Sequence, residues 1–108
     1  MRYQVRLTDD AASDLDELYL YIAQNDSPEN AESVLTKIEQ VLDSLSRTPK
    51  RGVYPKELVD LGIREYREVF FKPYRMIYRA IGRSVYVYLI ADGGREMQSV
   101  LQRRLLIG

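Results

Sequence analysis

The first residues of the chain alternate between apolar and polar side chains. Tyr3, Val5 and Leu7 are each flanked by polar residues, a period of two that is typical of a strand with one buried face. Thr8 can cap the start of a helix, and the two aspartates that follow it add negative charge where a helix dipole favours it. The pattern therefore predicts a short strand that ends at Thr8 and a helix directly after it.

Two long stretches then repeat their apolar residues at helical spacing. Ser27 and Pro28 separate them, and both residue types are typical of a helix start. The second stretch ends before Pro49, because proline disfavours helical geometry in the residue that precedes it. So short a connection predicts an antiparallel helical hairpin. The apolar stripes are Ala11, Leu15, Leu18, Tyr19, Ile22 and Ala23, then Ala31, Val34, Leu35, Ile38, Val41, Leu42 and Leu45, with Asp14, Asp16 and Glu17 off the first stripe.

The second half of the chain is rich in β-forming residues. Residues 50–62 contain glycine and proline without a sustained period, which predicts a loop with one short helical turn. Three runs follow at 63–71, 74–81 and 84–91, and their tight connections predict an antiparallel meander. The last run is apolar on both faces and should be the most enclosed strand. Met97 to Leu105 predicts a short closing helix or arm. The fold class is α+β, in a single domain over residues 1–108.

The composition bears on where in the cell this domain is expected. The 108 residues include no cysteine, so the fold depends on packing without disulfides, and we expect a cytoplasmic protein. The N-terminus lacks the apolar core of a signal peptide, and the longest apolar run is far shorter than the roughly 20 residues that span a bilayer. We therefore expect no membrane association.

The net charge of zero hides an uneven distribution. Residues 1–60 carry seven Lys and Arg against twelve Asp and Glu, a net charge of −5, whereas residues 61–108 carry nine against four, a net charge of +5. If the two halves form different faces, the basic one could meet an acidic partner or a phosphate backbone. A mixed, solvated surface explains the same composition.

Two segments resemble a known family. The opening TDDAASDLDELYLYIAQ is similar to the start of ParE-type toxins, and REYREVFFKPYRMIYRAIGRSVYVYLIADGGRE resembles the strand region shared by ParE and RelE toxins. The chain is thus identified as a member of the RelE/ParE toxin superfamily. The resemblance implies the toxin of a type II toxin-antitoxin (plasmid stabilisation) system, held inactive by a cognate antitoxin.

Two activities are implied by this resemblance, and the residues bear on the choice between them. RelE-like members cleave messenger RNA on the ribosome, whereas ParE-like members poison DNA gyrase. Aligned on the RelE pattern, Arg75 and Arg95 retain two cations, but the two lysines fall at Tyr66 and Glu68 and the C-terminal tyrosine falls near Leu101. The chain has no histidine, and leucine cannot transfer a proton. Inhibition of gyrase by protein binding is therefore favoured, without a catalytic residue. A ribosome-dependent endoribonuclease and a non-toxic antitoxin-binding module are the alternatives.

Candidate binding residues follow from this interpretation. Those for the target are Arg75, Arg95, Arg103 and Arg104, and those for the antitoxin are Leu15, Tyr19, Arg67 and Arg79. Structural roles explain some of them equally well: Arg75 and Arg79 could pair with Glu65 or Glu68 across the meander, and Arg103 and Arg104 could favour a helix C-terminus. Tyr66, Tyr78, Tyr86 and Tyr88 are interpreted as packing residues.

The sequence also leads to expectations about binding partners and cofactors. We expect an acidic, partly disordered antitoxin whose C-terminal segment folds across the hairpin and the sheet, because the basic half needs neutralising and a four-stranded sheet leaves an edge uncovered. No metal or organic cofactor is expected, since the chain has no His or Cys cluster and no glycine-rich phosphate loop. Sequence-specific nucleic-acid binding is not expected either.

Overall fold

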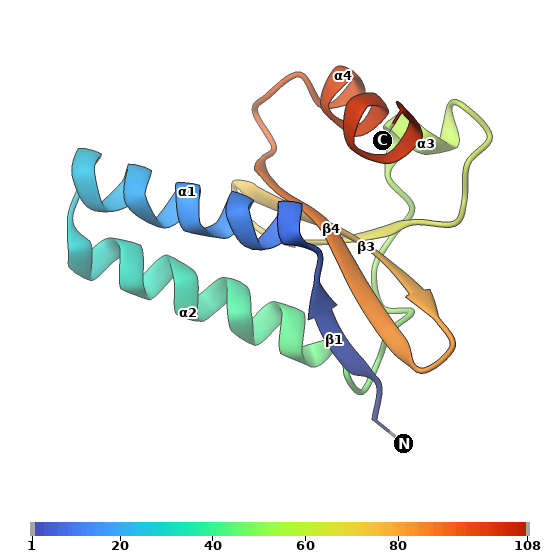
Figure 1. The fold of residues 1–108 in the computed structure, drawn as a ribbon, viewed down its shortest axis with the longest axis horizontal. Helices are drawn as coiled ribbons and strands as arrows, with labels where there is room; N and C mark the ends of the chain where they lie inside the picture. Colours follow the sequence, from blue (N-terminus) through green and yellow to red (C-terminus); the bar gives the residue numbers. More distant parts are fainter. Residues whose placement is uncertain (1, 108) are drawn as a thin grey trace.

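The computed structural model describes residues 2–107, which form one four-stranded sheet with helices on both of its faces (Figure 1). The strands are β1 (Gln4–Leu7), β2 (Arg67–Phe71), β3 (Tyr74–Ile81) and β4 (Ser84–Asp92). The helices are α1 (Asp9–Asn25), α2 (Pro28–Ser44), α3 (Lys56–Val59) and α4 (Met97–Leu101), followed by a π-helical segment, η1 (Gln102–Ile107). The predicted α+β fold is confirmed in element order and type.

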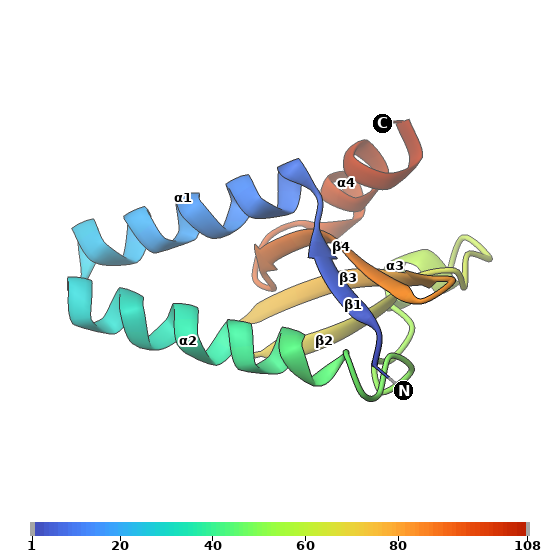
Figure 2. The same ribbon diagram turned by 60° about the horizontal axis from the view of Figure 1, so that its bottom comes forward.

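Both long helices begin where their capping residues stand. The Thr8 hydroxyl accepts a hydrogen bond from the backbone N–H of Ala11 at 3.1 Å, and the Ser27 hydroxyl accepts one from Asn30 at 3.0 Å. These bonds satisfy N–H groups that the first turn of a helix leaves without a partner. The short link between α1 and α2 turns the chain back on itself, so the predicted antiparallel hairpin is confirmed (Figures 1 and 2).

The sheet has the strand order β1-β4-β3-β2. Strands β2, β3 and β4 form the predicted antiparallel meander, and β1 adds to the far side of β4 in parallel, with Val5 opposite Val85. The parallel connection is possible because the hairpin carries the chain from β1 across one face of the sheet. Strand β4 therefore lies inside the sheet, as its doubly apolar sequence predicts.

A β-bulge in β4 changes which alternate residues of the strand face the hairpin. Ile77 pairs with Leu89 but the next residue, Tyr78, pairs with Val87, so Tyr88 has no opposite residue in β3. One extra residue reverses the alternation of side chains along a strand. Val87 before the bulge and Ile90 after it consequently belong to the same core cluster.

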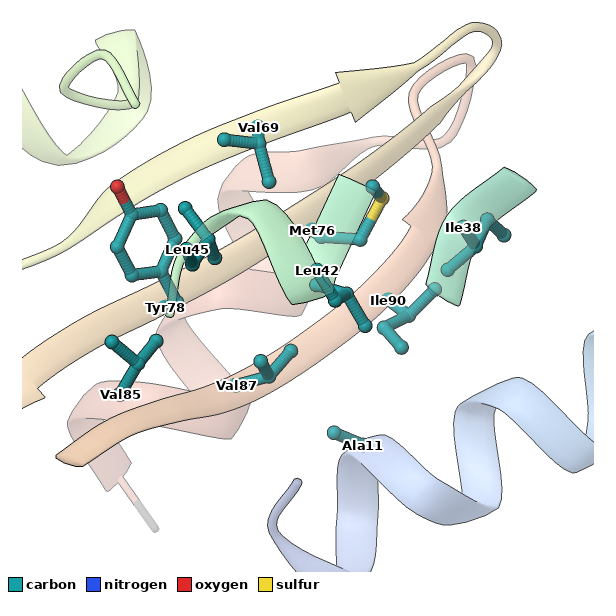
Figure 3. Close-up of a cluster of buried hydrophobic side chains, with 10 residues drawn as sticks. All are labelled: Ala11, Ile38, Leu42, Leu45, Val69, Met76, Tyr78, Val85, Val87 and Ile90. Carbon is teal, nitrogen blue, oxygen red and sulfur yellow. The ribbon is translucent and has the colours of Figure 1, made fainter. Parts of the chain in front are cut away.

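Two cores result, one on each face of the sheet. The first lies between the sheet and the hairpin and contains the ten residues drawn in Figure 3, among them Ile38, Leu42 and Tyr78. The second lies under α3 and α4, where Leu58, Met97 and Leu101 pack on β3 and β4. The meander thus contributes buried residues to a core on each of its faces. None of the helices within residues 2–107 is long and apolar enough to cross a membrane.

One strand prediction was too long. Residues 63–66 are not in a strand, and β2 begins at Arg67. Gly62 adopts a φ of 77°, which favours glycine, and this turn lets Ile63 donate to the carbonyl of Leu58 at 2.8 Å. The segment wraps around the end of α3 and places Tyr66 edge-on to Tyr88, with ring centroids 5.5 Å apart. Packing of side chains on the second core therefore outweighs the β propensity of these residues. The predicted single helical turn in the loop is present as α3.

The hydroxyl of Tyr78 connects the loop before α3 to the buried sheet through hydrogen bonds. Tyr78 is 0% exposed, donates to the carbonyl of Pro49 at 2.6 Å and accepts from the N–H of Gly52 at 3.0 Å. Tyr78→Phe leaves both backbone groups without this partner, and we expect the free energy of unfolding to fall by about 1–3 kcal/mol in urea titrations. Tyr54→Phe removes a hydroxyl from an exposed side chain and is the matched control. Equal effects of the two variants would contradict the anchoring role.

Candidate functional site

Arg75 lies at the centre of an ion-pair network on the α3 side of the sheet. Its Nε is 2.6 Å from Oε1 of Glu68 on the neighbouring strand, and its two terminal nitrogens each lie 2.8 Å from the carboxylate oxygens of Glu57 in α3. The bond to Glu68 confirms the structural alternative for Arg75. Gly93 packs against this side chain, since a Cβ there would lie 3.0 Å from Cδ of Arg75.

The pKa values of the two carboxylates in this network shift in opposite directions. Hydrogen bonding to Glu57 raises the pKa of Arg75, so the guanidinium stays charged. The hydrogen bond from Arg75 lowers the pKa of Glu57, whereas burial raises the pKa of Glu68 by more than Arg75 lowers it. Three donors of Arg75 are therefore directed at the protein itself, which leaves little for an external phosphate.

Arg104 forms a second network with α1. Its terminal nitrogens lie 2.8 and 3.0 Å from the carboxylate of Asp14, and it also donates to the carbonyl of Tyr88 at 2.8 Å. Asp14 in turn accepts from the N–H of Ile90 at 3.0 Å. Strand β1 pairs with β4 only as far as Val87, so these side chains satisfy the edge of β4 beyond the end of β1. Asp14 lies off the apolar stripe, but its side chain is only 14% exposed because it faces Arg104 and strand β4.

Arg95 and Arg103 present their charges to solvent. Both are exposed, and together with Asp10, Val100 and Arg104 they line an open pocket of about 300 Å³. The turn before Arg95 is held by two hydrogen bonds: the N–H of Gly93 donates to the carbonyl of Pro73 at 2.7 Å, and the N–H of Gly94 donates to the Asp92 carboxylate at 2.8 Å. Arg95 therefore extends from a hydrogen-bonded turn, and Arg103 extends from the helical segment η1.

The sheet arginines assigned to the antitoxin contact aromatic rings. Arg67 donates to the carbonyl of Gly52 at 2.9 Å and lies 4.5 Å from the ring centroid of Tyr54. Arg79 lies 5.9 Å from the ring centroid of Tyr66, and within residues 2–107 it forms no ion pair. Cations placed over rings in this way gain a modest electrostatic attraction. The alternative that Arg79 pairs with Glu65 or Glu68 is therefore not what the structure has.

The positions aligned with RelE lysines and tyrosine are enclosed. Tyr66, Glu68 and Leu101 are 9%, 5% and 1% exposed, and Leu101 belongs to the second core. On the other side of the sheet, Leu15 and Tyr19 lie half-buried in a groove of the hairpin. The structure thus separates the candidate residues among three places: the enclosed sheet face, the C-terminal pocket and the hairpin.

Sequence reasoning missed Glu57 and Asp14 as partners of the two held arginines. Glu57 belongs to residues 50–62, whose sequence has no sustained period, and Asp14 is separated from Arg104 by ninety positions, so no local spacing connects either pair. Within residues 2–107, no group of three or more His, Cys, Asp or Glu side chains could hold a metal ion.

Comparison with known proteins identifies the family. Residues 5–97 match the family model described as the ParE toxin of the type II toxin-antitoxin system parDE. The chain belongs to the ParE toxin family. It is the toxin of a ParDE type II toxin-antitoxin system, and its partner is a cognate antitoxin. The curated protein Toxin ParE3 of Caulobacter vibrioides is 28% identical over 95 residues, which cover 86% of this chain and 89% of that protein.

Solved structures share the fold of this ParE-family toxin. A chain of the chromosomal ParDE system of P. aeruginosa superposes with a TM-score of 0.71 at 21% identity, covering 84% of this chain and 96% of that one. A chain of the RelBE2 toxin-antitoxin complex of Mycobacterium tuberculosis gives 0.56 at 23% identity, covering 85% and 92%. A mutant of E. coli toxin RelE in the free state gives 0.67 at 14% identity, covering 98% and 100%.

The Arg75 network predicts a pH-dependent defect. Arg75→Ala leaves the buried Glu68 carboxylate unpaired, and we expect the free energy of unfolding at pH 7 to fall by about 3–5 kcal/mol. Burial raises the native pKa of Glu68 above the ordinary value of 4.5, and loss of Arg75, which lowers this pKa, raises it further in the variant. The charge of Glu68 therefore opposes folding more strongly in the variant than in wild type at neutral pH, and this extra cost fades as pH falls and the carboxylate is protonated. The deficit of the variant relative to wild type should therefore shrink on acidification, as measured by urea titrations from pH 7 to pH 5.

The double variant Arg75→Ala/Glu68→Gln separates loss of the pair from burial of an unpaired charge. It should be more stable at pH 7 than Arg75→Ala alone. Arg64→Ala removes an exposed arginine and is the control, with an expected change within about 0.5 kcal/mol. A deficit that is the same at every pH, with no recovery in the double variant, would contradict the role given to Glu68.

Proposed function

We propose that this ParE-family toxin inhibits DNA gyrase by binding it, without cleaving RNA. The observation that carries the proposal is the enclosed sheet face: Glu68 and Leu101 are 5% and 1% exposed, and Arg75 is held by two carboxylates. Membership of the ParE family favours the same target, because the sequence resemblance implies gyrase for ParE-like toxins and the ribosome for RelE-like ones.

RNA cleavage would need groups that this face lacks. Attack by a 2′-hydroxyl requires one group to remove a proton, another to protonate the leaving oxygen, and cations that stabilise the charged phosphorane. A carboxylate at Glu68 repels a phosphate, and Leu101 supplies no proton. The guanidinium of Arg75 faces Glu57 and Glu68 in place of solvent. These features support a binding function over a catalytic one.

The surface that contacts gyrase in this proposal is the C-terminal pocket. Arg95 and Arg103 are its exposed cations, and both extend from regular or hydrogen-bonded backbone. Arg75 and Arg104 take a different part than the sequence suggested, because their donors are directed at Glu57, Glu68 and Asp14. We therefore assign target contact to the first two arginines and positioning of the surrounding elements to the second two.

The antitoxin is proposed to occupy the other surfaces. Leu15 and Tyr19 line the hairpin groove, and Arg67 and Arg79 lie on strands of the sheet as half-buried residues. An acidic antitoxin segment suits the two arginines, because opposite charges at an interface speed association and favour the correct partner. The affinity of the purified pair should accordingly weaken as salt concentration rises.

Purified toxin should distinguish the two activities directly. We expect it to inhibit supercoiling by gyrase in vitro and to leave messenger RNA intact on programmed ribosomes, because the residues that would cleave RNA are enclosed or replaced. Addition of the antitoxin should restore supercoiling, which is the control for specific inhibition. Codon-specific cleavage in the ribosomal A site, together with unchanged supercoiling, would overturn the proposal.

Arg95 is the residue whose loss should uncouple toxicity from folding. Arg95→Ala removes an exposed cation from the pocket and disturbs none of the ion pairs found within residues 2–107. We expect growth arrest to disappear at matched expression while the melting temperature and antitoxin affinity stay near wild type. Arg83→Ala removes an exposed arginine at the β3–β4 turn and should keep its toxicity. Full growth arrest by Arg95→Ala would assign this residue no part in target binding.

A further inference from the structure

Three segments that are far apart in the sequence meet at one end of the sheet. The N–H of Tyr3 donates to the carbonyl of Ser46 at 2.8 Å, and the N–H of Gln4 donates to the carbonyl of Arg83 at 2.9 Å. These bonds join the beginning of β1 to the loop after α2 and to the β3–β4 turn, which lie at the same end of the molecule in both views (Figures 1 and 2). We refer to residues 2–6, 46–51 and 82–84 together as the basic end.

The basic end concentrates positive charge. Its segments contain no Asp or Glu, and they carry six exposed cations: Arg2, Arg6, Arg47, Lys50, Arg51 and Arg83. Within residues 2–107 none of these six takes part in an ion pair. Arg6 donates to the side-chain oxygen of Gln4 and Arg51 to the hydroxyl of Ser44, so both use neutral acceptors and keep other donors for an external ligand. A surface of this kind attracts anions.

This surface is separate from those assigned above. No residue of the basic end lines the C-terminal pocket that carries Arg95 and Arg103, and none lines the hairpin groove. The basic end has an open pocket of its own, with a volume of about 440 Å³, between Tyr3 and residues 48–51. Neither the proposed gyrase contact nor the proposed antitoxin contact therefore explains why these cations are gathered here.

The side chains of the basic end favour a phosphate backbone over an acidic protein surface. Five of the six cations are arginines, whose planar guanidinium groups can each direct two hydrogen bonds at a phosphate. None of the large apolar side chains exposed in residues 2–107 belongs to the basic end, although Val53 and Ile81 border it. Protein–protein interfaces have an apolar core, whereas interfaces with DNA are polar and strongly positive.

The backbone that presents these cations bears on how they would bind. They extend from one end of an edge strand, from the loop after α2 and from a tight turn, so no helix of the basic end is presented to the major groove of a duplex. Contacts to phosphates fix a protein on DNA without reading its sequence, which is done through base edges in the grooves. The arrangement therefore suits attachment to DNA of any sequence.

We propose that the basic end binds the phosphate backbone of double-stranded DNA, independently of base sequence. The inference rests on the proposed function in one respect: DNA is the substrate of gyrase, so a toxin that contacts gyrase is held beside a duplex. Simultaneous contact with the enzyme and with its DNA would hold the toxin more tightly than either contact alone, because the second contact becomes intramolecular.

The test measures DNA binding by the whole purified toxin in the absence of gyrase. A fluorescently labelled duplex of roughly 20 base pairs is titrated with toxin, and its anisotropy is followed from about 50 to about 200 mM salt. Each phosphate contact contributes about 0.9 to the slope of log affinity against log salt, so we expect a slope of about −3 or steeper. Two duplexes of unrelated sequence should bind with affinities that agree within about threefold.

Arg47→Gln/Lys50→Gln/Arg83→Gln removes three exposed cations of the basic end and disturbs no ion pair found within residues 2–107. It should weaken DNA binding at low salt by at least about tenfold and make the slope shallower by about 2–3, with a melting temperature near that of wild type. The matched control, Lys37→Gln/Arg64→Gln/Lys72→Gln, removes three exposed cations outside the basic end. It should keep the affinity of wild type within about threefold.

Arg95→Ala connects this test to the proposed function. The variant should bind DNA like wild type, because Arg95 lies in the C-terminal pocket. No binding at low salt, equal losses in the two triple variants, or a loss in Arg95→Ala as large as in the basic-end variant would each overturn the inference. Displacement of the duplex by a glutamate-rich peptide of equal charge would also overturn it, in favour of an acidic protein partner. Supercoiling by gyrase is assayed separately, so a toxin that binds DNA without inhibiting gyrase would contradict only the proposed function.

Discussion

Strand β4 has apolar side chains on both faces, so other elements of the chain must cover each face of the sheet. Val87 and Ile90 lie in the first core under the hairpin, and Leu89 lies in the second core under α3 and α4. The bulge at Tyr88 distributes these residues between the two cores. Burial of this strand contributes strongly to stability, because removal of apolar area from water is the dominant favourable contribution to folding.

The edges of β4 impose a further requirement. Strand β3 covers one edge along its whole length, but β1 covers the other only as far as Val87. Beyond that point the backbone is satisfied by Asp14 and Arg104, which also tie the C-terminal segment to α1. The positions that align with RelE lysines and tyrosine lie in this enclosed part of the sheet. In the proposed function the sheet serves as scaffold, and the toxin acts through its exposed surfaces.

Much of this architecture could be predicted from local patterns. The helix starts at Thr8 and Ser27, the short helical turn in the loop and the central position of β4 all follow from spacing and capping chemistry. The parallel pairing of β1 with β4 depends on contacts between distant segments, which periodicity does not report. The end of the predicted strand at 63–66 was wrong because Tyr66 gains more from packing on the second core than from pairing in a sheet.

The candidate site was predictable in part only. Arg95 and Arg103 are exposed and line one pocket, but their role in target contact stays a prediction. Arg75 was correctly linked to Glu68 as one alternative. Glu57 and Asp14 carry no local signal, because an ion pair between distant residues has no spacing rule. The acidic character of the hairpin was visible as a charge excess in residues 1–60. That Asp16 and Glu32 line the same groove could be seen only in the structure.

Contact between the C-terminal arginine surface and gyrase can be tested by crosslinking in cells. A photo-crosslinking amino acid replaces Gln102, which is exposed and adjacent to Arg103, and the toxin is expressed without its antitoxin. We expect a covalent adduct with a gyrase subunit that disappears when the antitoxin is co-expressed. Adducts with ribosomal proteins or messenger RNA, and none with gyrase, would contradict it.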